Sequence, residues 1–269
     1  MLDIRLFREK PEALKVMLRN RGVEFSVEKV TELDEKRRAI IVCAEELRAE
    51  RNRGSKTVAE AKRSGKDAKD LMERMKAVGQ QIKELEEELA EIDTAIRDLL
   101  LQVPNWPHGS VPVGPDESAN EEIRVWGEPV KFAFEPRPHW ELGEKLGILD
   151  FERGVRLAQS RFTVLKGPGA KMARALIGFM LDLHTGEHGF TEIQPPFLVN
   201  SATMQGTGQL PKFADDLYSC SGEDLWLIPT AEVPLTNLHS GEIIEETDLP
   251  LYYTAYTPCF RREAGSHGK

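Results

Sequence analysis

The sequence predicts an α+β protein in which an antiparallel pair of long helices precedes a domain built on an antiparallel β-sheet. Apolar residues repeat in heptads through the first hundred residues. All four tryptophans and 15 of the 16 prolines lie after residue 100, where short strand-like segments recur. A chain of 269 residues is long enough for about two domains. We place the boundary between residues 105 and 106, so that the predicted domains are 1–105 and 106–269.

The helical pair is predicted from two runs of apolar residues. The second run advances by alternating steps of three and four, the spacing of a coiled-coil seam. It consists of Leu71, Met75, Val78, Ile82, Leu85, Leu89, Ile92, Ile96, Leu99 and Val103. A less regular run from Val30 to Ala61 precedes it, and a Ser-Gly pair between Arg63 and Asp67 is typical of a turn. Two helices of about 35 residues predict an arm roughly 50 Å long.

The predicted tip of this arm is basic. Between Arg48 and Lys76 there are ten basic and five acidic side chains, although the whole chain has a net charge of −9. One interpretation is an ordinary solvated coiled-coil surface. The other is a surface that contacts nucleic-acid phosphates. Because the tip has no aromatic side chains, the second interpretation favours recognition of the backbone and shape of structured RNA.

The second domain is predicted to begin with a linker and to alternate helix with short strands. Two prolines within residues 103–109 exclude a continued helix there. Residues 170–184 have the periodicity of an amphipathic helix. The candidate strands are residues 190–193, 224–228, 242–245 and 251–257. Short strands with little helix between them favour an antiparallel sheet.

Composition argues against several protein classes. Three dispersed cysteines without a Cys-x-x-Cys pair argue against a disulfide scaffold and against a cysteine-rich zinc site, so we predict no metal ligands. The chain has no run of 18 apolar residues, and its first residues lack the apolar stretch of a signal peptide. We therefore expect a soluble, cytoplasmic protein without a membrane partner.

The first candidate binding segment is Pro229-Thr230-Ala231-Glu232. In an extended backbone Thr230 and Glu232 point to one side and Ala231 to the other. A hydroxyl beside a carboxylate suits an ammonium group and a small polar ligand. A solvent-facing loop is the alternative interpretation of these four residues.

The second candidate segment is Phe260-Arg261-Arg262-Glu263. The same alternation places Arg261 and Glu263 on one face and Arg262 on the other. A structural ion pair is one interpretation of Arg261 and Glu263. A phosphate clamp is the other, because the planar guanidinium donates two parallel hydrogen bonds.

Taken together and in order, these segments resemble bacterial-type seryl-tRNA synthetases, and the resemblance spans essentially the whole chain. It begins with the opening residues 1–6 and includes the basic-tipped arm. Gly189–Val199, with Pro196, is similar to class II synthetase motif 1. Pro229–Glu232 is similar to the serine-binding TxE loop, and Phe260–Glu263 fits the Phe-Arg-x-Glu pattern of motif 2.

The resemblance implies a fold and a reaction. The second domain is then the first part of a class II synthetase catalytic domain, an antiparallel sheet that stops within motif 2. The implied activity is that of a serine–tRNA ligase, which makes seryl-adenylate from L-serine and ATP and passes the seryl group to tRNA(Ser). It further implies Mg²⁺, a homodimer formed through motif 1, and a cytoplasmic location.

The resemblance also assigns roles to residues. Arg261 is the catalytic residue and contacts the α-phosphate, and Arg262 and Glu263 join it in the ATP site. Thr230 and Glu232 face the serine, to which Ala231 contributes only backbone. Four arm residues are expected to contact tRNA: Lys62, Arg63, Lys66 and Lys69. Because the sequence stops at Lys269, within motif 2, an inactive tRNA-binding protein or a coiled-coil interaction protein stays open as an alternative.

Overall fold

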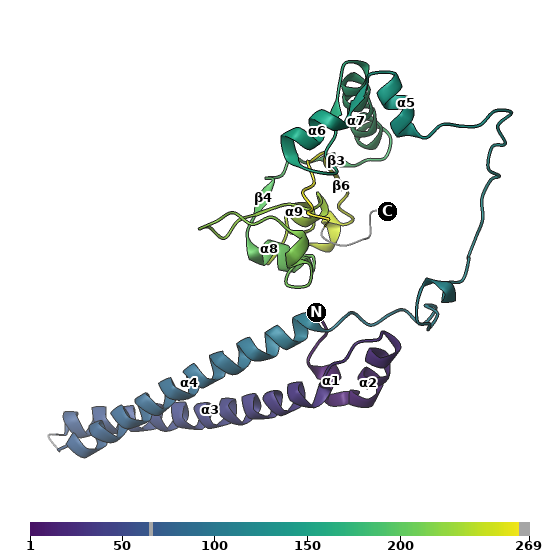
Figure 1. Cartoon of the computed structure of the whole chain (residues 1–269). Coiled ribbons are helices and arrows are strands. Elements are labelled where there is room, and N and C mark those ends of the chain that lie inside the picture. The colour runs from purple at the N-terminus through teal and green to yellow at the C-terminus, as the bar shows by residue number, and fades with distance from the viewer. Residues whose placement is uncertain (65–66, 264–269) are drawn as a thin grey trace. The chain divides into compact units, whose positions relative to one another are not determined.

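The protein consists of two units, each described here by itself. The computed structural model describes residues 1–64 and 67–263. Contacts within the chain separate an arm unit, Met1–Val125, from a sheet unit, Trp126–Lys269 (Figure 1).

The arm unit contains two short helices followed by two long ones. They are α1 (Arg5–Glu9), α2 (Pro11–Asn20), α3 (Val27–Arg63) and α4 (Lys69–Gln102). Figure 1 shows α3 and α4 lying side by side along the arm. The predicted turn between them falls partly on residues 65 and 66, which lie outside the described residues.

Ion pairs between α3 and α4 show that these helices run antiparallel, as predicted. Arg37 on α3 pairs with Asp93 on α4 at 2.5 Å. Nearer the tip, Glu50 on α3 pairs with Arg74 on α4 at 2.6 Å. The partner position on α4 therefore moves backward as the position on α3 moves forward, which is the register of an antiparallel hairpin.

The predicted apolar seam forms the interface between the two long helices. Every residue of the run on α4, from Leu71 to Leu99, is buried or half-buried. On α3 the pattern is interrupted at Arg51, which is exposed. Close to it, a Cβ on Gly54 would lie only 2.1 Å from the Met75 sulfur, so glycine lets the helices approach there. The run on α3 is thus irregular where a small residue, Gly54, accommodates the Met75 side chain.

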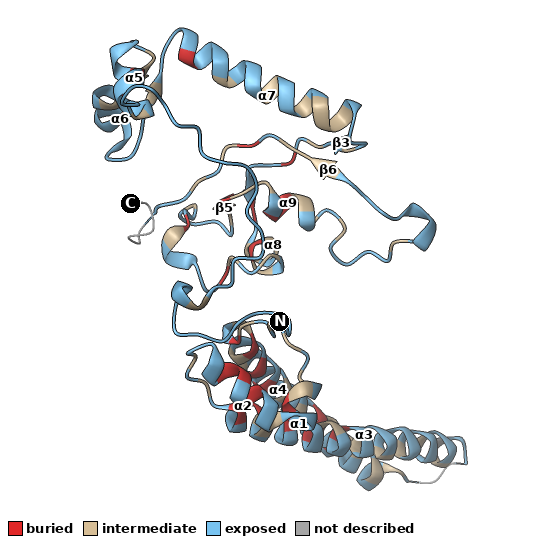
Figure 2. Ribbon diagram, turned by 90° about the vertical axis from the view of Figure 1, so that its right-hand side faces the viewer, coloured by how far each residue is buried: buried red, intermediate tan, exposed pale blue. Residues whose placement is uncertain are grey.

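The largest group of buried side chains lies at the base of the arm, where α1 and α2 pack against α3 and α4 (Figure 2). Phe7, Leu14 and Val30 are fully buried there. The same region buries Asp34, which pairs with Arg38 at 3.1 Å and with Arg8 of α1 at 3.3 Å. The short helices α1 and α2 were not predicted, because five and ten residues are too few for a clear helical period.

After α4 the chain has little regular structure until α5. The helix ends where Val103 adopts an extended conformation, before the two prolines. Arg21, directly after α2, donates a hydrogen bond to the carbonyl oxygen of Asn105 at 2.6 Å, which ties the start of this stretch to the helices of the arm unit. A single turn of 3-10 helix, η1 (Glu117–Ala119), interrupts the stretch within the described residues.

The sheet unit consists of short strands and helices. Its first part contains α5 (His139–Lys145), β1 (Leu149–Asp150), α6 (Phe151–Ala158), β2 (Val164–Leu165) and α7 (Pro168–Gly186). Its second part contains β3 (Thr191–Glu192), β4 (Leu198–Val199), α8 (Ser201–Gly206), η2 (Ala214–Asp216), β5 (Trp226–Leu227), α9 (Glu232–Thr236), η3 (Glu246–Asp248) and β6 (Tyr253–Thr254). The predicted helix at 170–184 and the strands at 190–193, 224–228 and 251–257 are therefore confirmed in position.

Strand pairing agrees with the prediction in two pairs and differs in one. β1 pairs with β2 and β4 pairs with β5, both antiparallel. β3 and β6 are parallel, with Thr191 opposite Tyr253, so the antiparallel prediction is wrong for this pair. The long connection between β3 and β6 allows the chain to cross over and return in the same direction, as parallel pairing requires.

The prediction of a strand at residues 242–245 is also wrong. This segment follows Gly241, which has a φ of 82°, and precedes the 3-10 helix η3. Ile243 is 97% exposed, and the adjacent Ile244 is only half-buried. The segment therefore buries too little apolar surface to hold it against a neighbouring strand.

A second apolar cluster lies beneath β4, β5, α8 and α9. Met204, Ile228 and Val233 are fully buried in it, and Trp226 packs against them. Ile228 directly precedes the candidate segment Pro229–Glu232, and Val233 directly follows it. The cluster therefore fixes both ends of that segment.

Candidate active site

The two candidate segments and one further loop meet around a pocket of about 310 Å³ in the sheet unit. Thr230 and Glu232 line it from the turn between β5 and α9, and Arg261 lines it from the chain after β6. The remaining lining residues are Gln209, Phe213, Asp216, Leu217 and Pro229. Residues from three separate parts of the sequence thus surround one small cavity.

Thr230 and Glu232 lie at this pocket for a different reason from the predicted one. Ala231 has helical backbone angles, with φ −61° and ψ −25°, and Glu232 is the first residue of α9. The extended alternation assumed for residues 230–232 is therefore wrong. The turn into α9 brings Thr230 and Glu232 to the same cavity, and the Thr230 hydroxyl accepts a hydrogen bond from the Glu232 main-chain N–H at 3.4 Å.

Arg261 is held by a bond to the neighbouring segment. Its Nε donates to the carbonyl oxygen of Pro229 at 3.0 Å. On either side the main chain is also fixed, because the N–H of Phe260 donates to Ile228 and that of Arg262 donates to Asp216, both at 2.9 Å. The guanidinium is therefore positioned through its Nε, and this bond does not involve its two η nitrogens.

Arg262 and Glu263 are exposed and do not belong to the lining of the pocket. The alternation assumed for residues 260–263 is wrong here too, since these residues form no strand and Glu263 has a left-handed φ of 50°. This conformation turns the chain after Arg262. The Glu263 carbonyl oxygen accepts a hydrogen bond from Arg161 Nη1 at 2.8 Å.

The charges around the pocket suit a small zwitterion. Glu232 and Asp216 contribute carboxylates to the lining, and Arg261 contributes a guanidinium. A carboxylate binds an ammonium group, and the guanidinium fork binds a carboxylate or phosphate through paired hydrogen bonds. The volume lies at the lower end of the range found for small-molecule sites.

Four lining residues were not found from the sequence: Gln209, Phe213, Asp216 and Leu217. They come from the loop between α8 and β5, which approaches Arg261 only in the folded chain. The contact between Asp216 and Arg262 joins positions far apart in the sequence. No local spacing signals such a contact.

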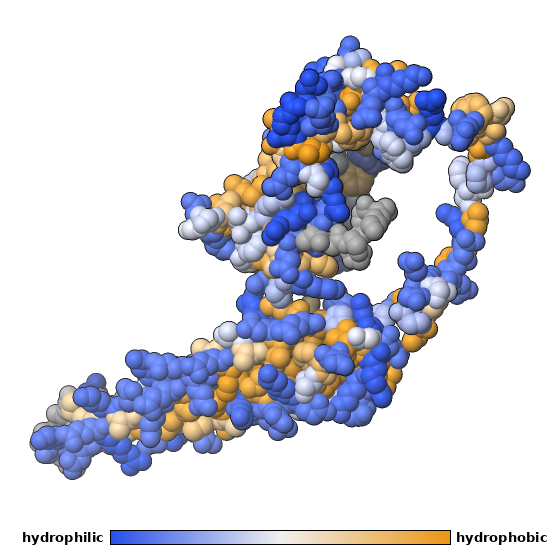
Figure 3. Space-filling model, in the orientation of Figure 1, coloured by the Kyte–Doolittle hydropathy of each residue, from blue (hydrophilic) through white to orange (hydrophobic). Residues whose placement is uncertain are grey.

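At the arm tip, the structure describes two of the four predicted tRNA contacts. Arg63 and Lys69 are exposed at the facing ends of α3 and α4. Lys66 and the side chain of Lys62 lie outside the described residues. Figure 3 shows that hydrophilic side chains cover this end of the arm.

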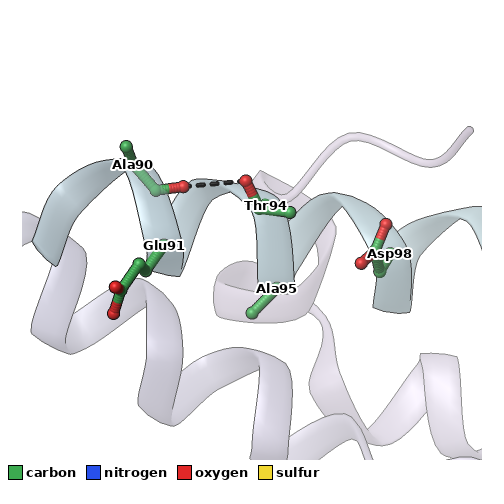
Figure 4. A pocket seen from close by; sticks show the side chains of 5 residues that line it. All are labelled: Ala90, Glu91, Thr94, Ala95 and Asp98. Carbon is green, nitrogen blue, oxygen red and sulfur yellow. Dashed lines mark hydrogen bonds between the residues drawn. The ribbon is translucent and has the colours of Figure 1, made fainter. Parts of the chain in front are cut away.

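A second hollow, on α4, does not have the features of a site. Figure 4 shows Ala90, Glu91, Thr94, Ala95 and Asp98 around it. The Thr94 hydroxyl donates to the Ala90 carbonyl oxygen of its own helix at 2.8 Å. The hollow is therefore the space between side chains along one helix.

Within residues 1–64 and 67–263, no group of three or more His, Cys, Asp or Glu side chains has the arrangement needed to hold a metal ion. No helix in this part of the chain is both long enough and apolar enough to cross a membrane.

Two protein-family models match parts of the chain. The model of the seryl-tRNA synthetase N-terminal domain matches residues 1–107, and the model of the class II tRNA synthetase core domain (G, H, P, S and T) matches residues 216–268. Over all 269 residues the chain is 53% identical to the serine–tRNA ligase of Syntrophomonas wolfei and 52% identical to that of Geobacter sulfurreducens. Residues 1–107 are thus similar to the N-terminal domain of seryl-tRNA synthetases, and the whole chain is similar to serine–tRNA ligases.

Solved structures of seryl-tRNA synthetases have the same fold. The enzyme from Pyrococcus horikoshii, complexed with ATP, matches the whole chain with a TM-score of 0.84 and 36% identity. The cytoplasmic enzyme from Naegleria fowleri, in complex with AMP, matches it with a TM-score of 0.78 and 29% identity. The chain covers 65% and 66% of these two proteins, and 63–64% of the two bacterial relatives.

Proposed function

We propose that this protein is a serine–tRNA ligase. In the first step a carboxylate oxygen of L-serine attacks the α-phosphorus of ATP, and pyrophosphate leaves. In the second step a tRNA(Ser) hydroxyl attacks the carbonyl of seryl-adenylate, and AMP leaves. The observation that supports the proposal best is the meeting of Thr230, Glu232 and Arg261 at one small pocket in a chain that matches serine–tRNA ligases over its whole length.

In this proposal the pocket binds serine. The Glu232 carboxylate pairs with the ammonium group, and the Thr230 hydroxyl provides a further polar contact, while Ala231 contributes only its backbone. A pocket that hydrogen-bonds the serine hydroxyl rejects alanine, because binding alanine leaves buried polar groups unpaired.

Arg261 is the proposed catalytic residue. Negative charge increases at the α-phosphate during attack, and a guanidinium already held in place by Pro229 stabilises that charge without further reorganisation. The η nitrogens of Arg261 also bind the serine carboxylate, which brings the nucleophile to the phosphate. Arg262 and Glu263, which follow directly, are proposed to contact other parts of ATP.

Magnesium enters this proposal only with the nucleotide. The described residues contain no group of three or more side chains suited to a metal ion. Magnesium at nucleotide sites is usually held by phosphates, water and one or two carboxylates, which does not require such a group. MgATP is therefore the proposed substrate.

The arm is the proposed tRNA-binding element, and 1–105 and 106–269 are the proposed arm and catalytic domains. Exposed basic residues such as Arg63 and Lys69 are suited to phosphates. We also propose a homodimer formed through Gly189–Val199. Exposed apolar side chains on the preceding helix, α7, support an interface there: Met172, Leu176, Phe179 and Met180. The cytoplasm is the proposed location, in keeping with the substrates.

Serine-dependent exchange of pyrophosphate into ATP tests the function. The purified full-length protein should catalyse exchange with L-serine and not with L-alanine. Exchange that does not depend on serine, or the absence of exchange, would contradict the proposal. The alternative of an inactive tRNA-binding protein predicts tRNA binding without exchange, so the same preparation distinguishes the two.

A further inference from the structure

A loop outside the candidate pocket contains unusual backbone conformations. Within the described residues, the non-glycine residues with positive φ are Gln159 at 88°, Arg161 at 73° and Glu263 at 50°. Two of them are joined, since Arg161 Nη1 donates to the Glu263 carbonyl oxygen at 2.8 Å. Such conformations persist where surrounding contacts fix them, and they concentrate at functional sites.

The structure shows how the loop containing Arg161 is fixed. It begins at the end of α6, where the Gln159 N–H donates to the Val155 carbonyl at 2.8 Å. A Cβ on Gly154 of α6 would lie 2.3 Å from the Phe162 carbonyl oxygen, so the loop backbone packs directly on the helix. The loop then enters β2, which pairs with β1. Arg161 is therefore presented from a firmly attached loop.

The acceptor of the Arg161 hydrogen bond belongs to the segment Phe260–Glu263, in which each residue makes a hydrogen bond to another part of the chain. Phe260 and Arg262 are fixed by their main-chain N–H groups, and Arg261 by its side chain, all to the chain around Asp216 and Ile228–Pro229. At Glu263 the anchor is the bond from Arg161. Arg161 thus fixes the last residue of this segment from a part of the chain that does not line the pocket.

We propose that Arg161 is a positioning residue for ATP binding, acting through the main chain of Glu263. This inference rests on the proposed function. Without the guanidinium, the left-handed backbone at Glu263 has lost its anchor and relaxes, which displaces its carboxylate from the nucleotide. Serine binding is affected less, because Thr230 and Glu232 are fixed by β5, α9 and the apolar cluster beneath them.

The most informative variant is Arg161→Gly. Glycine adopts a φ of 73° without strain, so this change removes the hydrogen bond while relieving the backbone. In the full-length protein we expect the KM for ATP in serine-dependent exchange to rise roughly 10-fold or more, as for the loss of a charge-assisted hydrogen bond. The KM for serine should stay within about two-fold, and the thermal midpoint should be unchanged or higher. A residue with a purely structural role would lower the midpoint instead.

Two further variants serve as a conservative replacement and as a control. Arg161→Lys keeps a donor on a flexible stem and should restore part of the ATP affinity. Arg156→Ala removes a neighbouring arginine of α6 that pairs with Glu152 of its own helix at 2.5 Å, and it should leave both KM values unchanged.

The inference is wrong if Arg161→Gly leaves the KM for ATP at the wild-type value, or if it raises both KM values by the same factor. Calorimetric titration with ATP alone provides a readout that does not need activity. If the wild-type protein binds ATP but shows no exchange, the proposed function fails, and the comparison of ATP affinities still decides the role of Arg161.

Discussion

Replacing Arg261 with alanine is the most direct test of the candidate active site. A guanidinium has five N–H donors, and the bond from Nε to Pro229 uses one of them. Four donors on the two η nitrogens are then available to a ligand. Removal of a single preorganised donor to developing negative charge costs about 10²–10³ in rate. For a side chain that donates in pairs we expect Arg261→Ala to lower kcat for exchange by about 10³, which is about 4 kcal/mol.

The assay is serine-dependent ATP–pyrophosphate exchange with the full-length protein, and Arg262→Ala is the matched control. The contact that Arg262 makes to Asp216 uses its main-chain N–H, which alanine keeps. We therefore expect a fall of less than ten-fold for the control. Equal losses in the two variants would refute the assignment of Arg261 to the pocket. Arg261→Lys should lie between them, since a point charge remains but the fork is lost.

Three other predictions concern the arm, a close backbone contact and a titrating ion pair. Glutamate in place of the four basic arm residues should weaken tRNA binding and flatten its salt dependence in filter-binding titrations, while pyrophosphate exchange stays unchanged. The four residues are Lys62, Arg63, Lys66 and Lys69. An unaltered affinity for tRNA would contradict a role of the arm in tRNA binding. Gly154→Ala should destabilise the fold by about 1–3 kcal/mol in urea unfolding, because its Cβ would meet backbone. Gly54→Ala should cost less, since its Cβ meets only the end of a methionine side chain. The Arg153 main-chain N–H, together with the Arg153 and Lys166 side chains, holds the pKa of Asp150 well below its ordinary value of 3.8. Asp150 therefore stabilises the fold above about pH 4 and loses this effect as pH falls further, so the stability deficit of Asp150→Asn should be largest at pH 7 and shrink by pH 3.

The sequence predicted the parts of the fold that depend on local spacing. The antiparallel pairing of α3 and α4 follows from heptads on neighbouring segments, and the seam from Leu71 to Leu99 is where the pattern placed it. The parallel pairing of β3 with β6 was missed because it depends on how a long connection crosses the unit. Strand direction is not encoded in the alternation of a four-residue segment.

In the candidate site, too, the sequence predicted the local motifs and missed the contacts that depend on tertiary structure. Thr230, Glu232 and Arg261 were identified through short motifs, and they do line one pocket. The argument from strand alternation was nonetheless wrong, because α9 begins at Glu232 and the chain turns at Glu263. Asp216 and Arg161 were missed because each contacts the motif 2 segment only through tertiary structure.

The parallel pairing of β3 with β6 also has a consequence for synthesis on the ribosome. Thr191 cannot pair until Tyr253, 62 residues further along the chain, has been synthesised. At 5–20 residues per second this delay lasts roughly 3–12 s. The arm is synthesised earlier, since even its pair Arg37–Asp93, 56 residues apart, is complete before β3 is made. The arm can therefore fold while the nascent β3 edge is still unpaired, and that interval is when the growing chain most needs protection by chaperones.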